Sequence, residues 1–437
     1  MKKYLTLIPF FLLFSALLLQ GCQNTQKAQT PSAADPIADT EQAVAYTANT
    51  ASEENTNDKI LIPSPTDFVT EEYMTQADMW KVCDDTTLAA VMKKAAAGEP
   101  VTIACIGGSI TQGTISSGTD DSSLNERKCY ADIFFSWWES TFPDTEFTFI
   151  NAGIGATDSY LGVHRVGKDV LEHHPDLVLV EFSVNDGSSV TDKRNYDNLV
   201  RRILLSENAP AVMLLFMGQT NGASAQDIHA NIGFNYKLPM VSYMNVLSAM
   251  LSDGTYKEKQ LSGDTTHPSA LGHAITGEIL WKYLNNVYME YETFGEPIPF
   301  TKEAVTNDVF LDSEILDNTT LVLDETGTFT EGSAFANYKN GWSNTDTDSS
   351  LTFTVTCKRL GFLYLCTTDG KSGQFDVYVD GEYTGTLNAD FKGGWGNYAK
   401  AQEIFVGEDV AEHVITIQKA ENSQSDIFTL LGVLVAR

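Results

Sequence analysis

The chain has 437 residues, of which 43% are hydrophobic and 11% aromatic, enough apolar material for two folded domains and too much for a disordered or collagen-like chain. Its 58 acidic residues outnumber 28 lysines and arginines, which gives a formal net charge of −30 at pH 7. A surface with this charge repels phosphate backbones, so we expect no nucleic-acid partner.

Residues 1–21 predict a bacterial lipoprotein signal peptide. Lys2 and Lys3 precede a mostly apolar run over residues 4–19 that is short for a membrane span. The sequence Leu-Gln-Gly-Cys that ends at Cys22 resembles the lipobox, whose cysteine becomes the lipidated first residue. The resemblance implies a protein lipid-anchored at Cys22 to a bacterial membrane, in the cell envelope and outside the cytoplasm. The alternative is an uncleaved anchor with a chance cysteine.

Residues 22–58 are polar and small, which predicts a disordered tether. Over residues 59–296, strand-like and helix-like segments alternate, the order of an α/β domain with helices on both faces of a parallel sheet. We expect about five buried parallel strands, at residues 101–106, 147–151, 177–182, 212–216 and 240–244. The expected helices cover residues 87–97, 130–141, 161–173, 196–206, 225–236 and 269–288.

Residues 305–437 show a different pattern, in which short alternating runs are separated by glycine, asparagine and aspartate turns. This pattern predicts a second, all-β domain, a jelly-roll-like β-sandwich that serves as an accessory or carbohydrate-binding-like domain. The sequence leaves open whether this domain binds glycan by itself or completes an active site.

The cysteines and histidines favour neither a disulfide framework nor a metal centre. Beyond Cys22 an odd number remains, without a CxxC spacing: Cys83, Cys105, Cys129, Cys357 and Cys366. Pairing of Cys357 with Cys366 across neighbouring strands stays open. The histidines form no HExxH pattern, and we expect neither a metal nor a cofactor.

Three segments follow the first three expected strands, at the sheet edge where α/β proteins place their sites. Ser109 lies in Gly-Gly-Ser-Ile-Thr, and residues 151–157 form a glycine-containing turn with free backbone N–H groups. Asn185 closes the third strand with an amide that can donate to an oxyanion. Each segment alone also fits an ordinary turn or helix cap.

A fourth segment, Gly-Asp-Thr-Thr-His-Pro, precedes the last helix of the α/β domain. Asp264 can bind one ring nitrogen of His267 and direct the other toward a nucleophile, as in a serine hydrolase. The alternative role of Asp264 is a helix N-cap.

Together the four segments resemble those of the SGNH (GDSL-like) hydrolase superfamily, over residues 101–283. The resemblance implies a flavodoxin-like three-layer domain in which Ser109 is the nucleophile and His267, oriented by Asp264, is the base. One departure is Gly108, where the superfamily usually has aspartate, so the hydrogen bond that fixes the serine loop must come from elsewhere.

The same resemblance implies an oxyanion hole made of the backbone N–H groups of Ser109 and Gly155 and the side-chain amide of Asn185. A register without a gap places Ala156 in the position of Gly155, and a backbone donor works with either residue.

The superfamily acts on lipids, thioesters, peptides and acetylated sugars. We expect a secreted, lipid-anchored serine esterase that removes O-acetyl groups from carbohydrate. The signal, the absence of a long apolar insertion that would grip a lipid, and the likeness of the β-domain to accessory domains of carbohydrate esterases favour this substrate. The alternatives are a lipid or short-chain acyl esterase, similar to a lysophospholipase or thioesterase, and a non-catalytic glycan-binding lipoprotein.

Aromatic residues of the β-domain can stack on sugar rings, and the candidates are Trp342, Trp395, Tyr398 and Tyr383. Packing in the core or in turns is the alternative. Near the expected site we place Glu181 within the third strand and Arg165 on the surface of the following helix. These residues and His164 stay outside the catalytic set.

Overall fold

A computed structural model describes residues 61, 63–78, 83–119, 124, 126–344 and 350–437, all of which belong to one compact unit. The predicted signal peptide, the predicted tether and Cys22 lie outside the described residues. Within the described ranges, no helix is long and apolar enough to cross a membrane. The described residues do not divide further by their contacts, so the domain boundary between residues 296 and 305 stays a prediction.

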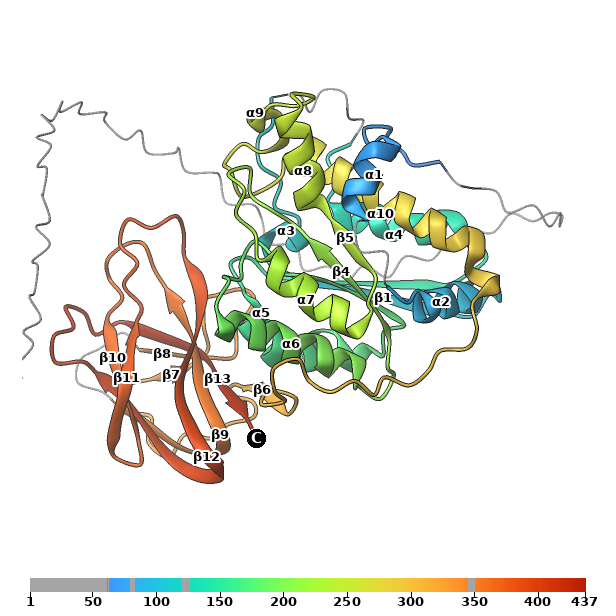
Figure 1. The fold of residues 1–437 in the computed structure, drawn as a ribbon. Helices are drawn as coiled ribbons and strands as arrows, with labels where there is room; N and C mark the ends of the chain where they lie inside the picture. The colour runs from blue at the N-terminus through green and yellow to red at the C-terminus, as the bar shows by residue number, and fades with distance from the viewer. Residues whose placement is uncertain (1–60, 62, 79–82, 120–123, 125, 345–349) are drawn as a thin grey trace, which may run out of the picture. The chain divides into compact units, whose positions relative to one another are not determined.

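The first sheet has five parallel strands in the order β2-β1-β3-β4-β5 (Figure 1). This is the order of flavodoxin-like folds, and it confirms the expected fold class. The strands are β1 (Val101–Gly107), β2 (Phe147–Gly153), β3 (Leu177–Glu181), β4 (Ala211–Phe216) and β5 (Met240–Ser242). Strands β1, β3, β4 and β5 are almost entirely buried, because helices cover both faces of the sheet.

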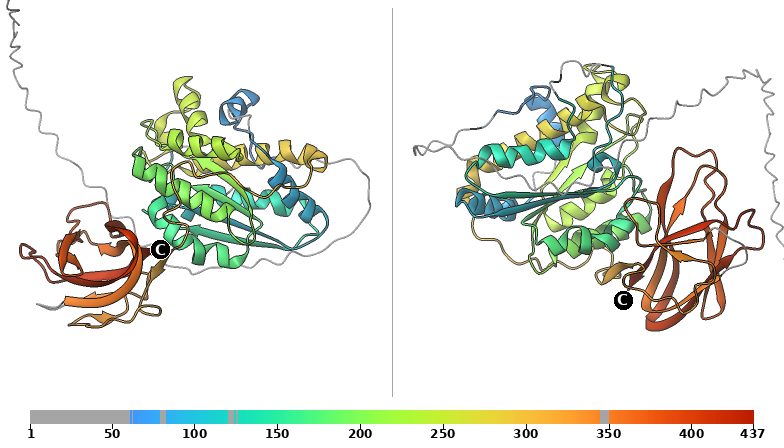
Figure 2. Two further views of the ribbon diagram at one scale, coloured as in Figure 1. Left: turned by 60° about the horizontal axis from the view of Figure 1, so that its bottom comes forward. Right: turned by 180° about the vertical axis from the view of Figure 1, so that it is seen from behind.

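Helices α5, α6 and α7 cover one face of this sheet, and α1, α2, α4, α8 and α10 cover the other (Figures 1 and 2). The helices and short 3-10 turns are α1 (Glu71–Ala77), α2 (Thr86–Ala96), α3 (Ser109–Gln112), α4 (Tyr130–Thr141), α5 (Ser159–Asp169), η2 (Leu171–His173), α6 (Val190–Leu204), α7 (Gln226–Tyr236), α8 (Tyr243–Ser252), α9 (Glu258–Leu261), α10 (Ala270–Glu290) and η3 (Tyr291–Thr293).

Two element boundaries differ from the expected ones because of helix caps. Residues 243–244, expected to end the fifth strand, begin α8, since the Ser242 hydroxyl accepts a hydrogen bond from the backbone N–H of Asn245. Helix α6 begins six residues before its expected start, at Val190 instead of residue 196. A capping box between Ser189 and Asp192 fixes that start.

The second sheet is antiparallel and confirms a C-terminal β-rich domain. Its strands are β6 (Ser313–Leu316), β7 (Thr330–Glu331), β8 (Trp342–Asn344), β9 (Ser350–Cys366), β10 (Gln374–Val379), β11 (Glu382–Asn388), β12 (Tyr398–Lys419) and β13 (Phe428–Ala436). They pair in the order β11-β10-β12-β9-β13-β8-β7, and β6 pairs with β13. Register shifts interrupt the long β9–β12 pair, and Figure 2 shows these strands curving around the core of the domain.

Cys357 and Cys366 are free, buried thiols on the same strand, β9. Nine residue-to-residue steps along the extended strand separate them by about 30 Å, because a strand rises about 3.3 Å per residue. Pairing across neighbouring strands, which the sequence left open, is therefore wrong.

The β-rich domain packs against α5 and α6. Leu363, Leu431 and Leu434 belong to the same apolar cluster as residues of these helices. Glu403 of β12 binds Arg194 of α6 at 3.0 Å and Arg359 of β9 at 2.5 Å. Both guanidinium groups lie over the ring of Phe310, at 4.9 and 5.3 Å from its centroid. One carboxylate thus balances two mostly buried cations.

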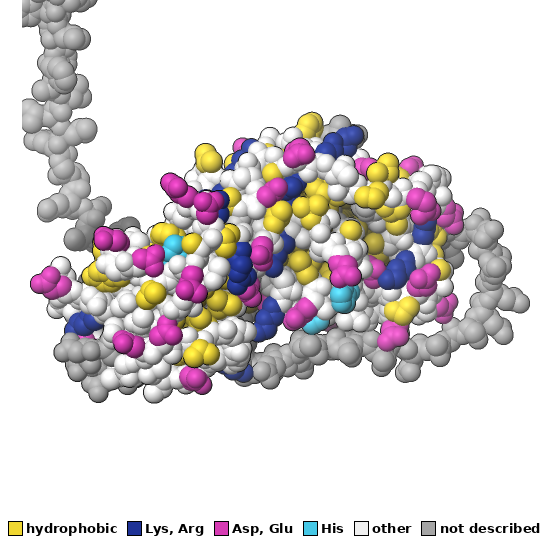
Figure 3. All heavy atoms as spheres, turned by 90° about the horizontal axis from the view of Figure 1, so that it is seen from below, with side chains coloured by type: hydrophobic (Ala, Val, Ile, Leu, Met, Phe, Trp, Pro, Cys, Tyr) yellow, Lys and Arg dark blue, Asp and Glu magenta, His cyan; other side chains and the backbone are white. Residues whose placement is uncertain are grey.

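Acidic, basic and apolar side chains are intermixed on the face of the molecule shown in Figure 3. The arginines and lysines near its centre have acidic neighbours. This face therefore offers no uniform basic surface to a phosphate backbone.

We predict that Glu403→Gln lowers the free energy of unfolding by about 2 kcal/mol, because two mostly buried guanidinium groups lose their counter-charge. The shift of the denaturant midpoint measures the effect. Lys371→Ala is the control: it removes an exposed ion pair with Asp369 and should cost less than about 0.5 kcal/mol. Equal shifts in the two variants would contradict a stabilising role for the Glu403 cluster.

Candidate functional site

Ser109 begins the short helix α3 directly after strand β1 and the N-cap residue Gly108. Its hydroxyl Oγ lies 2.8 Å from Nε2 of His267, and Nδ1 of His267 lies 2.7 Å from Oδ2 of Asp264. The structure therefore brings together the three residues that the sequence singled out as a serine, base and orienting carboxylate. Such an arrangement can activate a hydroxyl for nucleophilic attack.

The Asp264 carboxylate holds the His267 turn as well as the imidazole. Its Oδ1 accepts hydrogen bonds from the backbone N–H groups of Thr266 (3.0 Å) and His267 (2.7 Å). Burial tends to raise the pKa of Asp264, but the hydrogen bonds from His267 and Thr266 outweigh it, and the net pKa is lowered. The N-cap of α10 is Ser269, so the alternative role proposed for Asp264 falls to a different residue.

The carbonyl group of His267 is also fixed. It accepts hydrogen bonds from the hydroxyls of Ser116 (2.6 Å) and Ser262 (2.8 Å). These bonds restrain the backbone from which the imidazole projects, so that the ring has little freedom to leave Ser109.

Ser109 and His267 open into a cavity of about 720 Å³. Its lining residues come from both parts of the chain: Ser109, Gln112, Thr114, Ile154, Gly155, Ala156, Asn185, Asp264, Thr266 and His267 from the α/β region, and Phe335, Asn337, Trp395, Asn397 and Tyr398 from the C-terminal region. The β-rich domain therefore supplies part of the wall of the candidate site.

Gly108 is required by the close approach of Asn185. A Cβ atom at position 108 would lie 2.2 Å from Oδ1 of Asn185, a distance that real contacts do not reach. In this chain, any side chain at position 108 would displace the amide of Asn185.

Two residues of the turn at 151–157, Gly155 and Ala156, line the cavity. The N–H of Gly155 donates to Oε1 of Gln112 at 2.9 Å, so this donor is already engaged. Ala156 adopts a left-handed backbone conformation with φ of 59° and lines the same cavity. Sequence reasoning missed Gln112, although its place one helical turn after Ser109 was a usable signal.

The aromatic candidates of the β-rich domain separate into different environments. Trp395 is 71% exposed and lies 5.0 Å from Tyr398 between ring centroids, at the edge of the cavity. Trp342 is 2% exposed, because β8 pairs with β13 and directs its ring into the core of the β-rich domain. Trp342 therefore takes the alternative role, packing in the core, and offers no face to a ligand. Tyr383 is exposed on β11 and is not part of the cavity lining.

The three residues kept outside the catalytic set are all buried. Glu181 ends strand β3, as expected. Arg165 is 2% exposed and not on the helix surface, because its guanidinium group binds backbone carbonyls beneath the site. Burial lowers the pKa of His164 to about 4, and its Nδ1 lies 2.8 Å from the carbonyl oxygen of Tyr160.

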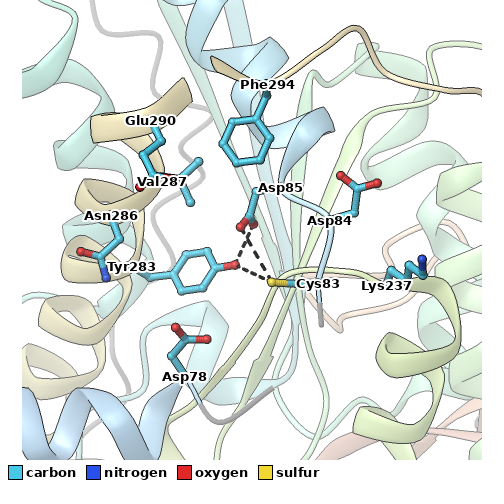
Figure 4. Close-up of a pocket in the computed structure, with 10 residues that line it drawn as sticks. All are labelled: Asp78, Cys83, Asp84, Asp85, Lys237, Tyr283, Asn286, Val287, Glu290 and Phe294. Carbon is cyan, nitrogen blue, oxygen red and sulfur yellow. Dashed lines mark hydrogen bonds between the residues drawn. The ribbon is translucent and has the colours of Figure 1, made fainter. Parts of the chain in front are cut away.

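A separate pocket lies between α10 and the start of α2 (Figure 4). Cys83 lines this pocket, and its Sγ lies 3.4 Å from the hydroxyl of Tyr283. That hydroxyl donates a hydrogen bond to Asp85 at 2.7 Å. Burial, with the charge of Asp85, raises the pKa of Cys83 to about 11. The thiol stays protonated and is a poor nucleophile. Among the described residues, no group of histidine, cysteine and acidic side chains could hold a metal ion.

Comparisons with known proteins agree with this geometry. Residues 105–275 match the GDSL-like Lipase/Acylhydrolase family. The chain is also similar to a crystal structure of a two-domain esterase (CEX) active on acetylated mannans, with 30% identity and a TM-score of 0.74 over 83% of this chain and 98% of that chain. A structure of such an esterase co-crystallised with mannopentaose has 29% identity and a TM-score of 0.72, over 83% and 97%. The comparison with curated proteins returned no relative.

We predict that Glu181→Gln makes stability less dependent on pH. Burial, with the nearby charge of Asp186, raises the pKa of Glu181 to about 7, and its Oε2 has no partner among the described residues. The folded state therefore keeps a proton that the unfolded state releases near pH 4.5. The contribution of Glu181 to the free energy of unfolding consequently falls as pH rises from about 4.5 to about 7.

As pH rises from about 5 to about 7.5, the free energy of unfolding of Glu181→Gln should increase relative to that of the wild type by about 1 to 3 kcal/mol. Denaturant titrations at several pH values measure this gain. Glu172→Gln, at an exposed position, is the control and should run parallel to the wild type. A parallel curve for Glu181→Gln would show that Glu181 ionises normally.

Proposed function

Because the chain belongs to the GDSL-like lipase/acylhydrolase family, we propose that it is a serine esterase that removes O-acetyl groups from mannan-type polysaccharide or oligosaccharide. The observation that carries the proposal is the 2.8 Å contact between Ser109 and His267 in a cavity whose wall includes Trp395. The similarity to the esterase active on acetylated mannans supports this substrate, because it extends over both domains.

In the proposed mechanism, Nε2 of His267 takes the proton of Ser109 as Oγ attacks the acetyl carbonyl carbon. The tetrahedral intermediate collapses to an acetyl-enzyme, and the sugar hydroxyl leaves with the proton that His267 returns. A water molecule, deprotonated by His267, then attacks the acetyl-enzyme and releases acetate. Asp264 stays ionised throughout and stabilises the imidazolium, in keeping with its lowered pKa.

The oxyanion of each tetrahedral intermediate needs fixed donors. We assign this role to the backbone N–H of Ser109, the side-chain amide of Asn185 and a backbone N–H of the 151–157 turn. Ala156 suits the last position without rearrangement, whereas Gly155 becomes available only after Gln112 releases its N–H. We therefore propose Ala156 in this role in place of Gly155, the donor expected from the sequence.

The substrate chain is proposed to lie against Trp395 and Tyr398. Aromatic faces suit the apolar faces of sugar rings, and the amides of Asn337 and Asn397 in the same wall can bond to hydroxyl groups. The lipobox at Cys22 supports a place for the enzyme outside the cytoplasm, anchored by lipid, where polymeric glycans are accessible.

The proposal is tested by acetate release from acetylated mannan, acetylated xylan and aryl esters of short and long acyl chains. We predict activity on acetylated mannan that falls at least about 10³-fold in Ser109→Ala, since the nucleophile is lost. Hydrolysis of long acyl esters alone would favour a lipid esterase instead. Glycan binding without acetate release in the wild type would favour a binding protein.

Trp395→Ala tests the sugar-binding wall. We predict that KM for acetylated mannan oligosaccharides rises about 5- to 10-fold, the cost of losing one aromatic stacking contact, while hydrolysis of a small aryl acetate changes less than about 2-fold. Steady-state kinetics on both substrates measure the split. Tyr383→Ala, an exposed aromatic outside the cavity, is the matched control. An unchanged KM in Trp395→Ala would remove Trp395 from the substrate path.

A further inference from the structure

We propose that Arg165 is a positioning residue for ester hydrolysis, which aligns the loop that carries Ser109 with the 151–157 turn. This inference rests on the proposed role of Ser109. Arg165 lies on α5 and its side chain is almost wholly buried. Its Nη2 donates to the carbonyl of Gly107 at 2.9 Å, and its Nη1 donates to the carbonyl of Ala152 at 2.7 Å.

The two carbonyls mark the ends of neighbouring strands. Ala152 pairs with Ile106, and Gly107 pairs with Gly153, in the parallel register of β1 and β2. The chain leaves β1 toward Ser109 and leaves β2 toward Ala156 within a few residues of these carbonyls. The Gly107 carbonyl also accepts the N–H of Ile154 at 3.1 Å. One guanidinium group therefore joins the two loops at the point where both depart from the sheet.

Arginine suits this place because its planar group presents several donors in a fixed geometry, which a lysine ammonium cannot do. Its charge is balanced by Asp169, one turn along the same helix, at 2.9 Å. Gly108 has no side chain, and Asn185 leaves no room for one, so position 108 cannot supply a side-chain hydrogen bond that fixes the loop of Ser109. The hydrogen bond from Arg165 to the carbonyl of Gly107 takes that role.

Arg165 acts through other residues and does not touch the proposed substrate. It lines a different cavity, of about 500 Å³, together with Arg202, and is not part of the Ser109 cavity. A shift of the two loops would misplace the oxyanion donors, which act mainly in the transition state. Loss of Arg165 should therefore lower kcat and leave KM nearly unchanged.

The test compares Arg165→Met, Arg165→Lys and Arg202→Met on a small aryl acetate, with folding of each variant checked by thermal unfolding. Arg202 is the matched control because it lines the same cavity and donates to the carbonyl of Val163, but touches neither strand end. We expect kcat to fall about 100-fold in Arg165→Met and about 10-fold in Arg165→Lys, with KM within about 3-fold, since small misplacements of reacting groups cost this much. Arg202→Met should retain kcat within about 3-fold of the wild type.

Chemical rescue distinguishes a positioning role of Arg165 from a role in fold stability alone. In Arg165→Ala, guanidinium ion at a concentration that leaves the wild type folded should restore part of kcat, because the adjoining cavity gives it access to the vacated position. No such gain is expected in Arg202→Ala. If Arg165→Met does not fold, Arg165→Lys and the rescue of Arg165→Ala decide the question.

The inference is overturned if the Arg165 variants keep wild-type kcat, if Arg202→Met loses as much as Arg165→Met, or if only KM changes. A wild-type protein that hydrolyses no ester would instead overturn the proposed function, and this inference with it. An active wild type with a fully active Arg165→Met removes the positioning role alone.

Discussion

The candidate site depends on one hydrogen bond between residues 158 positions apart, from the hydroxyl of Ser109 to the imidazole of His267. No local preference can form it, because the serine follows the first strand of the sheet and the histidine precedes the last long helix. The parallel sheet brings Ser109 and His267 to the edge formed by the carboxyl ends of its strands. Asn185, in the turn that follows β3, lies at the same edge. The helices that pack on both faces of the sheet stabilise the strands whose ends form this edge.

Beneath this edge lies a layer of buried polar groups that are satisfied mainly by backbone. Arg165 binds two carbonyls, and Asp186 accepts the N–H of Ser159 and lies 2.9 Å from Nε2 of His229. Glu181 accepts from Ser183 at 2.9 Å. Such groups are costly to bury without partners, and most of their polar atoms have one, although Oε2 of Glu181 has none among the described residues. These hydrogen bonds connect the strand ends and turns from which the loops of the candidate site depart.

The sequence predicted what depends on local pattern. Strands such as β1 and β4 are runs of apolar residues, and Asp264 and His267 are close enough in the chain for their contact to be foreseen. The contacts of Gln112 and Arg165 could not be predicted, because their partners come from other strands and loops. Trp342 and Trp395 have similar glycine-containing surroundings in sequence, yet one is in the core and the other in the cavity wall. Pairing of β8 with β13 decides the difference, and no local signal reports it.

The apolar cluster shared by α5, α6 and the leucines of β9 and β13 has a consequence for how such a protein can be inherited. A gene segment that encoded the α/β half alone would produce helices with an uncovered apolar face, and the β-rich half alone would expose the leucines that cover it. Glu403 would also lose one of its two arginines. Recombination that separates the halves is therefore penalised at the level of folding, before any loss of catalysis, and the two halves are expected to pass between genomes as a pair.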